Sequence, residues 1–152
     1  MELDKDLKAR QEAREAAELS EQAQKALALL EQPQLDAIVE AIAAAFSASS
    51  STLAQMAVEE TGFGNVPDKV VKNRFASEGV LQAVRGMKTV GVLKENEGIW
   101  EIGVPMGVIA AIVPSTNPTS TVCYKAIIAI KAGCSIVFSP HPKAINCTRE
   151  AA

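Results

Sequence analysis

Two short apolar runs, joined by a proline-bounded polar turn and a helical segment, constrain the fold of this chain more than any other feature. The first run, residues 108–113, holds six consecutive apolar residues, of which two are valine and two isoleucine. An unbroken run of this length is typical of a strand buried on both faces, as in a parallel sheet. Pro114 ends the run, and the polar turn at residues 115–118 cannot continue a strand.

A helix and a second strand are predicted after this turn. Cys123, Ile127 and Ile130 recur at the spacing of one helical face, and Gly133 lies just beyond the last turn, where helices commonly end. Residues 136–138 then form a second apolar run. Strand, helix and strand make a βαβ unit, whose crossover is almost always right-handed.

Each of the two strands ends in a polar turn bracketed by prolines, at residues 114–118 and 139–142. Parallel neighbouring strands bring their carboxyl ends to the same edge of a sheet, where ligands of open α/β proteins bind. The sequence therefore predicts a cofactor or substrate rim formed by these two turns.

The first half of the chain is predicted to be helical. Residues 3–30 are rich in strong helix formers. Their intermittent leucines allow a coiled-coil or partner-binding helix, but we favour a helix packed on its own domain. Further helices are expected from Pro33, after the serine-rich break at residues 47–52, where a serine hydroxyl would cap the helix, and from Pro67 to Gly86. Glu59 and Glu60 read as solvated surface charges.

Glycines punctuate residues 87–107, where two short strands are predicted at residues 90–93 and 99–102. The fold class is therefore α/β, with N-terminal helices followed by the start of a Rossmann-like parallel sheet. We divide the chain into a helical segment (1–86), a short β excursion (87–107) and a first βαβ unit of a dinucleotide-binding domain (108–152). Two parallel strands are too few for a self-sufficient sheet, so we expect the chain to be the front portion of a longer protein.

Composition narrows the possible partners and location. The net charge of -3 over 152 residues gives no electrostatic case for nucleic-acid binding. No apolar run is long enough to cross a membrane, and residues 1–14 do not form a secretory signal. The three cysteines form no CxxC pair and read as reduced, buried side chains of a cytoplasmic protein.

Three segments together resemble the CoA-acylating branch of the aldehyde dehydrogenase superfamily. They are EETGFGNVPDKVVKNRFASE (residues 59–78), GVPMGVIAAIVPSTNPTST (103–121) and IVFSPHPKA (136–144). The resemblance implies an incomplete aldehyde dehydrogenase fold. It also implies oxidation of a small-molecule aldehyde with NAD, and transfer of the acyl group from a cysteine thioester to coenzyme A. A homo-oligomer is expected for the full-length enzyme.

The resemblance also implies roles for individual residues. In the superfamily an asparagine of the first turn stabilises the oxyanion, and here Thr116 and Asn117 are both candidates, Asn117 being the better amide donor. The cofactor would be bound by residues of the two turns. These are Val113, Pro114, Ser115, Ser139, Pro140 and His141.

Two departures from the superfamily pattern bear on function. The second turn reads Ser139-Pro140-His141-Pro142 instead of the common Lys-Pro-Ser-Glu, whose Lys and Glu hold the adenosine ribose. The residues that contact the ribose must therefore differ in this chain. None of the three cysteines lies in a context that resembles the nucleophile. We therefore expect an N-terminal fragment that is inactive alone. The alternatives are a short non-catalytic nucleotide-binding or scaffolding protein and a helical interaction protein that uses residues 3–60.

Overall fold

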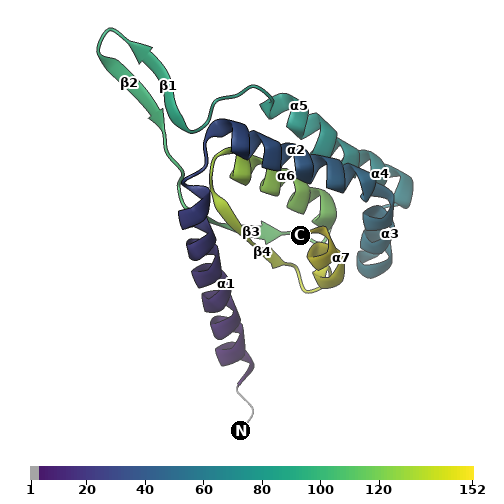
Figure 1. Cartoon of the computed structure of the whole chain (residues 1–152). Helices are drawn as coiled ribbons and strands as arrows, with labels where there is room; N and C mark the ends of the chain where they lie inside the picture. The colour runs from purple at the N-terminus through teal and green to yellow at the C-terminus, as the bar shows by residue number, and fades with distance from the viewer. Residues whose placement is uncertain (1–3) are drawn as a thin grey trace.

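The computed structural model describes residues 4–152, so Leu3, with which the first predicted helix begins, lies outside it. The first part of the chain is helical, and two small pairs of strands and two further helices follow it (Figure 1). The elements, in chain order, are α1 (Lys5–Leu27), α2 (Gln32–Ala48), α3 (Ser50–Thr61), α4 (Val66–Arg74), the π-helical turn η1 (Phe75–Gly79), α5 (Val80–Val84), β1 (Gly91–Asn96), β2 (Ile99–Gly103), β3 (Val108–Val113), α6 (Pro118–Lys131), β4 (Ser135–Pro140) and α7 (Ile145–Ala151).

Local sequence signals explain the starts of α2 and α4. Pro33 lies in the first turn of α2, and Glu31 and Gln34 form a reciprocal capping box there. The side chain of Asn65 caps α4 by accepting a hydrogen bond from the backbone N–H of Asp68 at 3.0 Å. The predicted serine cap of α3 is wrong: Ser49 precedes the helix but makes no side-chain capping bond. Instead α3 follows α2 almost directly, with the two axes meeting at 64°.

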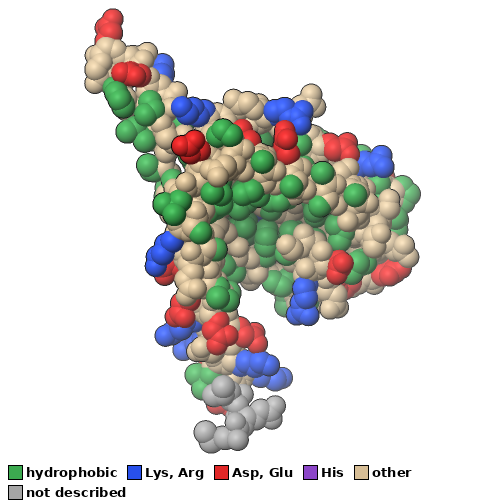
Figure 2. Space-filling model, in the orientation of Figure 1, with side chains coloured by type: hydrophobic (Ala, Val, Ile, Leu, Met, Phe, Trp, Pro, Cys, Tyr) green, Lys and Arg blue, Asp and Glu red, His purple; other side chains and the backbone are tan. Residues whose placement is uncertain are grey.

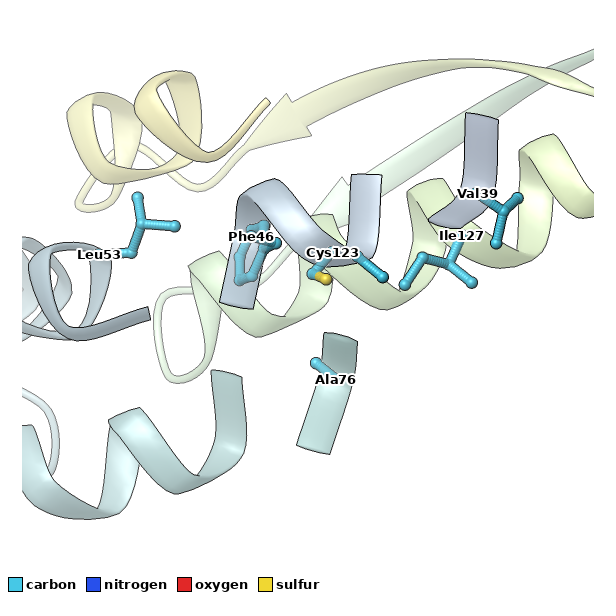
Figure 3. Packing of buried hydrophobic residues seen from close by; sticks show 7 residues of the cluster. Val39, Phe46, Leu53, Ala76, Cys123 and Ile127 are labelled. Atoms are coloured by element: carbon cyan, nitrogen blue, oxygen red, sulfur yellow. The ribbon is translucent and has the colours of Figure 1, made fainter. Parts of the chain in front are cut away.

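The main core lies where α2 and α6 pack together (Figure 3). Val39 and Phe46 of α2 meet Cys123 and Ile127 of α6, all of them buried. Each pair of residues is spaced to share one face of its helix, which is why these positions form a continuous apolar contact. The predicted stripes of both helices are therefore the packing faces of the core.

The two predicted strands of the βαβ unit pair in parallel, from Val108 opposite Ser135 to Val113 opposite Pro140. Ala111 and Val113 are buried, whereas Val108, Ala110 and Ile112 are exposed. The prediction that this strand is buried on both faces is therefore wrong. Ile112, which is 76% exposed, is an apolar side chain on the face of this strand that stays accessible at its carboxyl end.

The predicted β excursion is an antiparallel hairpin of β1 and β2 that projects from the body of the molecule (Figure 1). Figure 2 shows hydrophobic side chains along this hairpin below a charged tip. Helix α1 also extends away from the body, but it is tied to the start of β4. There the Ser20 hydroxyl donates to Ser135 Oγ (2.9 Å) and Gln24 Nε2 donates to the Gly133 carbonyl (2.8 Å). The helix thus packs on its own fold, as we favoured.

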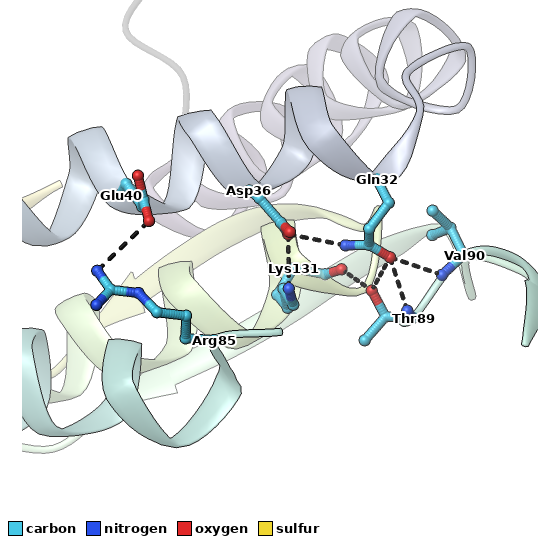
Figure 4. Close-up of polar contacts among 7 residues, drawn as sticks. All are labelled: Gln32, Asp36, Glu40, Arg85, Thr89, Val90 and Lys131. Carbon is cyan, nitrogen blue, oxygen red and sulfur yellow. Dashed lines mark hydrogen bonds and ion pairs between the residues drawn. The ribbon is translucent and has the colours of Figure 1, made fainter. Parts of the chain in front are cut away.

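A polar network joins α2 to α6 and to the segment before the hairpin (Figure 4). Asp36 Oδ1 accepts hydrogen bonds from Lys131 Nζ (2.6 Å) and from Gln32 Nε2 (2.9 Å). Gln32 Oε1 in turn accepts from the backbone N–H of Thr89 (2.7 Å). The network fixes the direction in which the chain leaves the helices.

Within residues 4–152 no single helix has the length and hydropathy needed to span a membrane, although the bent pair α2 and α3 reaches both when taken together.

Candidate functional site

The two predicted turns lie next to each other at the carboxyl edge of the parallel sheet. Ile112 pairs with Ser139 and Val113 with Pro140, and the backbone N–H of His141 donates to the Val113 carbonyl at 3.0 Å. Val113 is fully buried and anchors the corner. The residues predicted to bind cofactor are therefore brought together in one place, and Pro114, Ser139 and His141 are exposed there.

Helix α4 holds the first turn through three side chains that lie on one of its faces. Lys69 Nζ donates to the Thr116 carbonyl at 2.8 Å, and Lys72 Nζ donates to Asn117 Oδ1 at 3.1 Å. The buried carboxamide of Asn73 accepts a hydrogen bond from the Thr119 hydroxyl at 2.9 Å. The turn and the start of α6 are thus fixed by contacts to a helix some 45 residues earlier in the chain.

Sequence reasoning missed Lys69, Lys72 and Asn73. Their spacing of i, i+3 and i+4 places them on one helical face. That spacing was a visible signal in DKVVKN, but nothing local shows that this face meets the turn. Only the packing of α4 against α6 shows it.

The turn has a positive electrostatic environment. Lys69 is only 5% exposed, and burial, followed by the neighbouring charge of Lys72, lowers the pKa of its ammonium group. The amino end of α6 adds the partial positive charge of a helix N-terminus. An oxygen atom that gains negative charge would be stabilised beside this turn.

The Nδ2 group of the Asn117 carboxamide is available as a hydrogen-bond donor, because its Oδ1 atom is the one that faces Lys72. A lysine ammonium has donors and no acceptor, so the amide atom that faces Lys72 is Oδ1. The Nδ2 group makes one long contact of 3.5 Å to Thr116 Oγ1, and Asn117 makes no side-chain capping bond to α6 although it is the N-cap residue. Thr116, an exposed residue, lies next to it in the same turn.

The second turn offers hydroxyl and imidazole groups. His141 Nδ1 accepts from the backbone N–H of Lys143 at 3.1 Å, which leaves Nε2 as the other polar atom of the ring. Ser139 is exposed on the adjacent strand end. Both groups can exchange hydrogen bonds with sugar hydroxyls.

An apolar hollow of about 530 Å³ lies beside Lys72. It opens between α4, the π-helical turn, α5 and α6. Its lining residues are Val71, Lys72, Phe75, Ala76, Val80, Ser120 and Tyr124. Because Lys72 also contacts Asn117, this hollow is the apolar surface adjacent to the turn.

The three cysteines are buried free thiols. Burial raises the pKa of Cys123 to about 12. Burial, together with the nearby Glu60 carboxylate, also raises the pKa of Cys147 to about 12. These two thiols therefore stay protonated at neutral pH, the state in which a cysteine is a poor nucleophile.

A βαβ unit with polar turns at the carboxyl ends of its strands defines an α/β protein, the class in which ligands bind at this edge of the sheet. Residues 5–151 match the aldehyde dehydrogenase family, and the chain belongs to that family.

Three relatives show where in the family the chain falls. It is 47% identical over 132 residues to the bifunctional aldehyde-alcohol dehydrogenase AdhE of Escherichia coli K12. It is 44% identical over 126 residues to an acylating sulfoacetaldehyde dehydrogenase of Cupriavidus necator. The crystal structure of an acetylating aldehyde dehydrogenase from Geobacillus thermoglucosidasius superposes with a TM-score of 0.95 and 52% identity. The resemblance to the acylating branch is thus confirmed.

The matched regions make up most of this chain but only a small share of each relative. They cover 86% of this chain but 15% of the E. coli protein, and 80% of this chain but 26% of the C. necator protein. The match to the Geobacillus structure covers 98% of this chain and 33% of the other. The chain therefore spans a third or less of the relatives it matches.

Proposed function

We propose that this chain supplies the oxyanion-binding turn and part of the nucleotide rim of a CoA-acylating aldehyde dehydrogenase. The observation that carries the proposal is the Asn117 carboxamide, whose Oδ1 is held by Lys72 while Nδ2 stays available at the amino end of α6. Thr116 remains the second candidate for this role. The division into residues 1–86, 87–107 and 108–152 belongs to the same proposal.

In the proposed reaction a thiolate attacks the aldehyde carbon, and the carbonyl oxygen takes up the electron pair. Asn117 Nδ2–H would donate to that oxygen, and the positive environment of the turn would stabilise its charge. Collapse of the adduct expels hydride and leaves a thioester, from which coenzyme A takes the acyl group. All three cysteines are buried free thiols, and those of Cys123 and Cys147 stay protonated. None of them fits the nucleophile, so the thiolate would come from a part of the enzyme that this chain does not contain.

NAD, when bound, accepts the hydride. The hydroxyl of exposed Ser139 and the imidazole of His141 are suited to hydroxyls of its ribose. Pro114, Ser115 and Pro140 would form the surface between the two turns, and Val113, which is buried, would support the cofactor site from beneath through its backbone contact with His141. Solved relatives support nucleotide and CoA use: an engineered glycolyl-CoA reductase, 32% identical, has bound NADP+, and a Rhodopseudomonas palustris propionaldehyde dehydrogenase, 32% identical, has bound CoA. The apolar hollow beside Lys72 would take the carbon chain of the aldehyde.

A fused enzyme tests the proposal. The chain is joined to the remaining two thirds of the Geobacillus enzyme, and NADH formation is followed with aldehyde and CoA present or omitted. We expect CoA-dependent NADH formation from the fusion and none from the 152-residue chain. Nucleotide binding without turnover in the fusion would favour the non-catalytic alternative, and NADH formation by the chain alone would contradict the need for a further nucleophile.

Within the fusion, Asn117→Ala should lower kcat about 100-fold, or ~3 kcal/mol of transition-state stabilisation, with little change in NAD binding. Asn96→Ala, at the exposed end of β1, is the matched control and should be silent. Thr116→Val separates the two candidates in the turn. A loss with Thr116→Val and none with Asn117→Ala would transfer the role to Thr116.

A further inference from the structure

The three contacts that α4 makes with the turn and the start of α6 differ in what they hold in place. Lys69 Nζ holds a backbone carbonyl, that of Thr116, and the Asn73–Thr119 hydrogen bond secures the first turn of α6. Lys69, Asn73 and Thr119 are all buried. Lys72, in contrast, is exposed, and its ammonium group contacts a side chain, the carboxamide of Asn117.

We propose that Lys72 is a positioning residue that sets the polarity of the Asn117 carboxamide, holding Oδ1 so that the Nδ2–H donors face the reacting oxygen. The inference rests on the proposed function of the turn. A carboxamide can rotate by half a turn at little steric cost, and the rotated form would present an acceptor where a donor is needed. An ammonium group at 3.1 Å excludes that form, because it would then face a second donor.

The buried contacts of Lys69 and Asn73 fix the backbone without Lys72, so loss of Lys72 should leave the fold intact. What Lys72 adds is a charge-assisted hydrogen bond, which is stronger than one between neutral groups. The same charge withdraws electron density from the amide and makes its N–H groups better donors. Lys72 thus acts on the reaction through Asn117.

Kinetics of the fused enzyme test the positioning role. Lys72→Met should lower kcat about tenfold, equivalent to ~1.4 kcal/mol, with KM for the aldehyde nearly unchanged. Lys72→Arg keeps a charged donor and should restore most of the loss. Lys125→Met is the matched control, because Lys125 Nζ also donates to a carbonyl near the strand end, that of Ile112 at 2.7 Å, and it should keep full activity.

A double variant separates this inference from the function on which it rests. If Lys72 acts through Asn117, Lys72→Met should have no further effect in the Asn117→Ala background. An equal loss in both backgrounds, or no loss from Lys72→Met alone, would overturn the inference while leaving the role of Asn117 intact. If Asn117→Ala itself leaves kcat unchanged, the proposed role of Asn117 fails and the inference falls with it.

The chain itself provides a readout that needs no activity. In an isotope-labelled sample, Lys72→Met should shift the side-chain NH₂ resonances of Asn117 and leave backbone resonances outside the turn in place. Lys125→Met should leave the side-chain NH₂ resonances of Asn117 in place. Unchanged Asn117 NH₂ resonances in Lys72→Met would contradict the contact, and widespread backbone shifts would show a structural role instead.

Discussion

At the scale of single residues, Glu60 stabilises the start of α7 although it lies near the end of α3. Its Oε1 accepts from the backbone N–H of Asn146 (2.9 Å) and from Asn146 Nδ2 (3.0 Å), while Oε2 accepts from the backbone N–H of Cys147 (2.7 Å). Burial alone would raise the pKa of Glu60, but the hydrogen bonds from Cys147 and Asn146 outweigh it and lower the pKa. A carboxylate at a helix N-terminus also interacts favourably with the helix dipole.

We expect Glu60→Gln to lower the free energy of unfolding by ~1 kcal/mol, since an amide keeps one acceptor oxygen of the two that this cap uses. Urea unfolding of the 152-residue chain measures the effect. Glu59→Gln is the matched control, because Glu59 is exposed and accepts from Gln55 within the same helix. A Glu60→Gln effect no larger than that of the control would exclude the capping role.

The candidate site divides into residues that local sequence identifies and residues that it does not. Thr116, Asn117, Ser139 and His141 lie in turns whose prolines and polar residues follow apolar strands, so their meeting at one sheet edge could be predicted. Lys69, Lys72 and Asn73 could not be placed, and Glu60 was wrongly taken as a solvated charge. The partners that these residues contact at the turn and at the start of α7 lie 45 or more residues away, and the sequence of one segment does not contain that information.

At the scale of elements, the ion pair between α2 and α6 is distinctive because one partner is almost entirely buried. Lys131 has a side chain 4% exposed, whereas that of Asp36 is 37% exposed. Removing the carboxylate would leave a buried ammonium group without its counter-charge. The nearby pair of Arg85 and Glu40 joins α2 to the end of α5, but both its side chains are exposed (Figure 4).

Asp36→Ala should therefore destabilise the chain by ~3 kcal/mol, the lower end of the cost of breaking a buried pair, because water reaches Asp36. Glu40→Ala should cost less than ~1 kcal/mol, as exposed ion pairs do. Chemical denaturation of the two variants under identical conditions would measure both effects. Equal effects of the two substitutions would mean that Lys131 finds another partner or reaches solvent.

Element order and type followed from hydrophobic periodicity and turn residues, but the details that depend on packing did not. The proline starts of α2 and α4 were predicted because proline acts locally. The π-helical turn at Phe75–Gly79 was not, since residues 67–86 read as one helix. The exposed face of β3 was missed because an apolar run shows that burial suits both faces and cannot show what covers them.

At the scale of the whole molecule, acid sensitivity follows from carboxylates that the fold holds ionised. Burial would raise the pKa of Asp36, but the hydrogen bonds from Lys131 and Gln32 and the charge of Lys131 lower it below its ordinary 3.8. The pKa of Glu60 is likewise below its ordinary 4.5. In both cases the unfolded chain binds a proton more readily than the folded one, so stability is present above the ordinary pKa values and is lost as pH falls through the folded ones.

The free energy of unfolding should accordingly change little between about pH 7 and 5 from these two groups and should fall below about pH 4.5. Each extra proton bound by the unfolded chain contributes a slope of up to ~1.4 kcal/mol per pH unit. The double variant Asp36→Asn, Glu60→Gln should be less stable at neutral pH but should lose less stability on acidification. Glu40→Gln with Glu59→Gln removes two exposed carboxylates and should keep the steep profile. If the free energy of unfolding falls with pH in parallel for the parent chain and the Asp36, Glu60 variant, other groups control acid unfolding. If it falls less steeply in the variant, protonation of Asp36 in the α2–α6 pair and of Glu60 in the α7 cap is what destabilises the folded chain in acid.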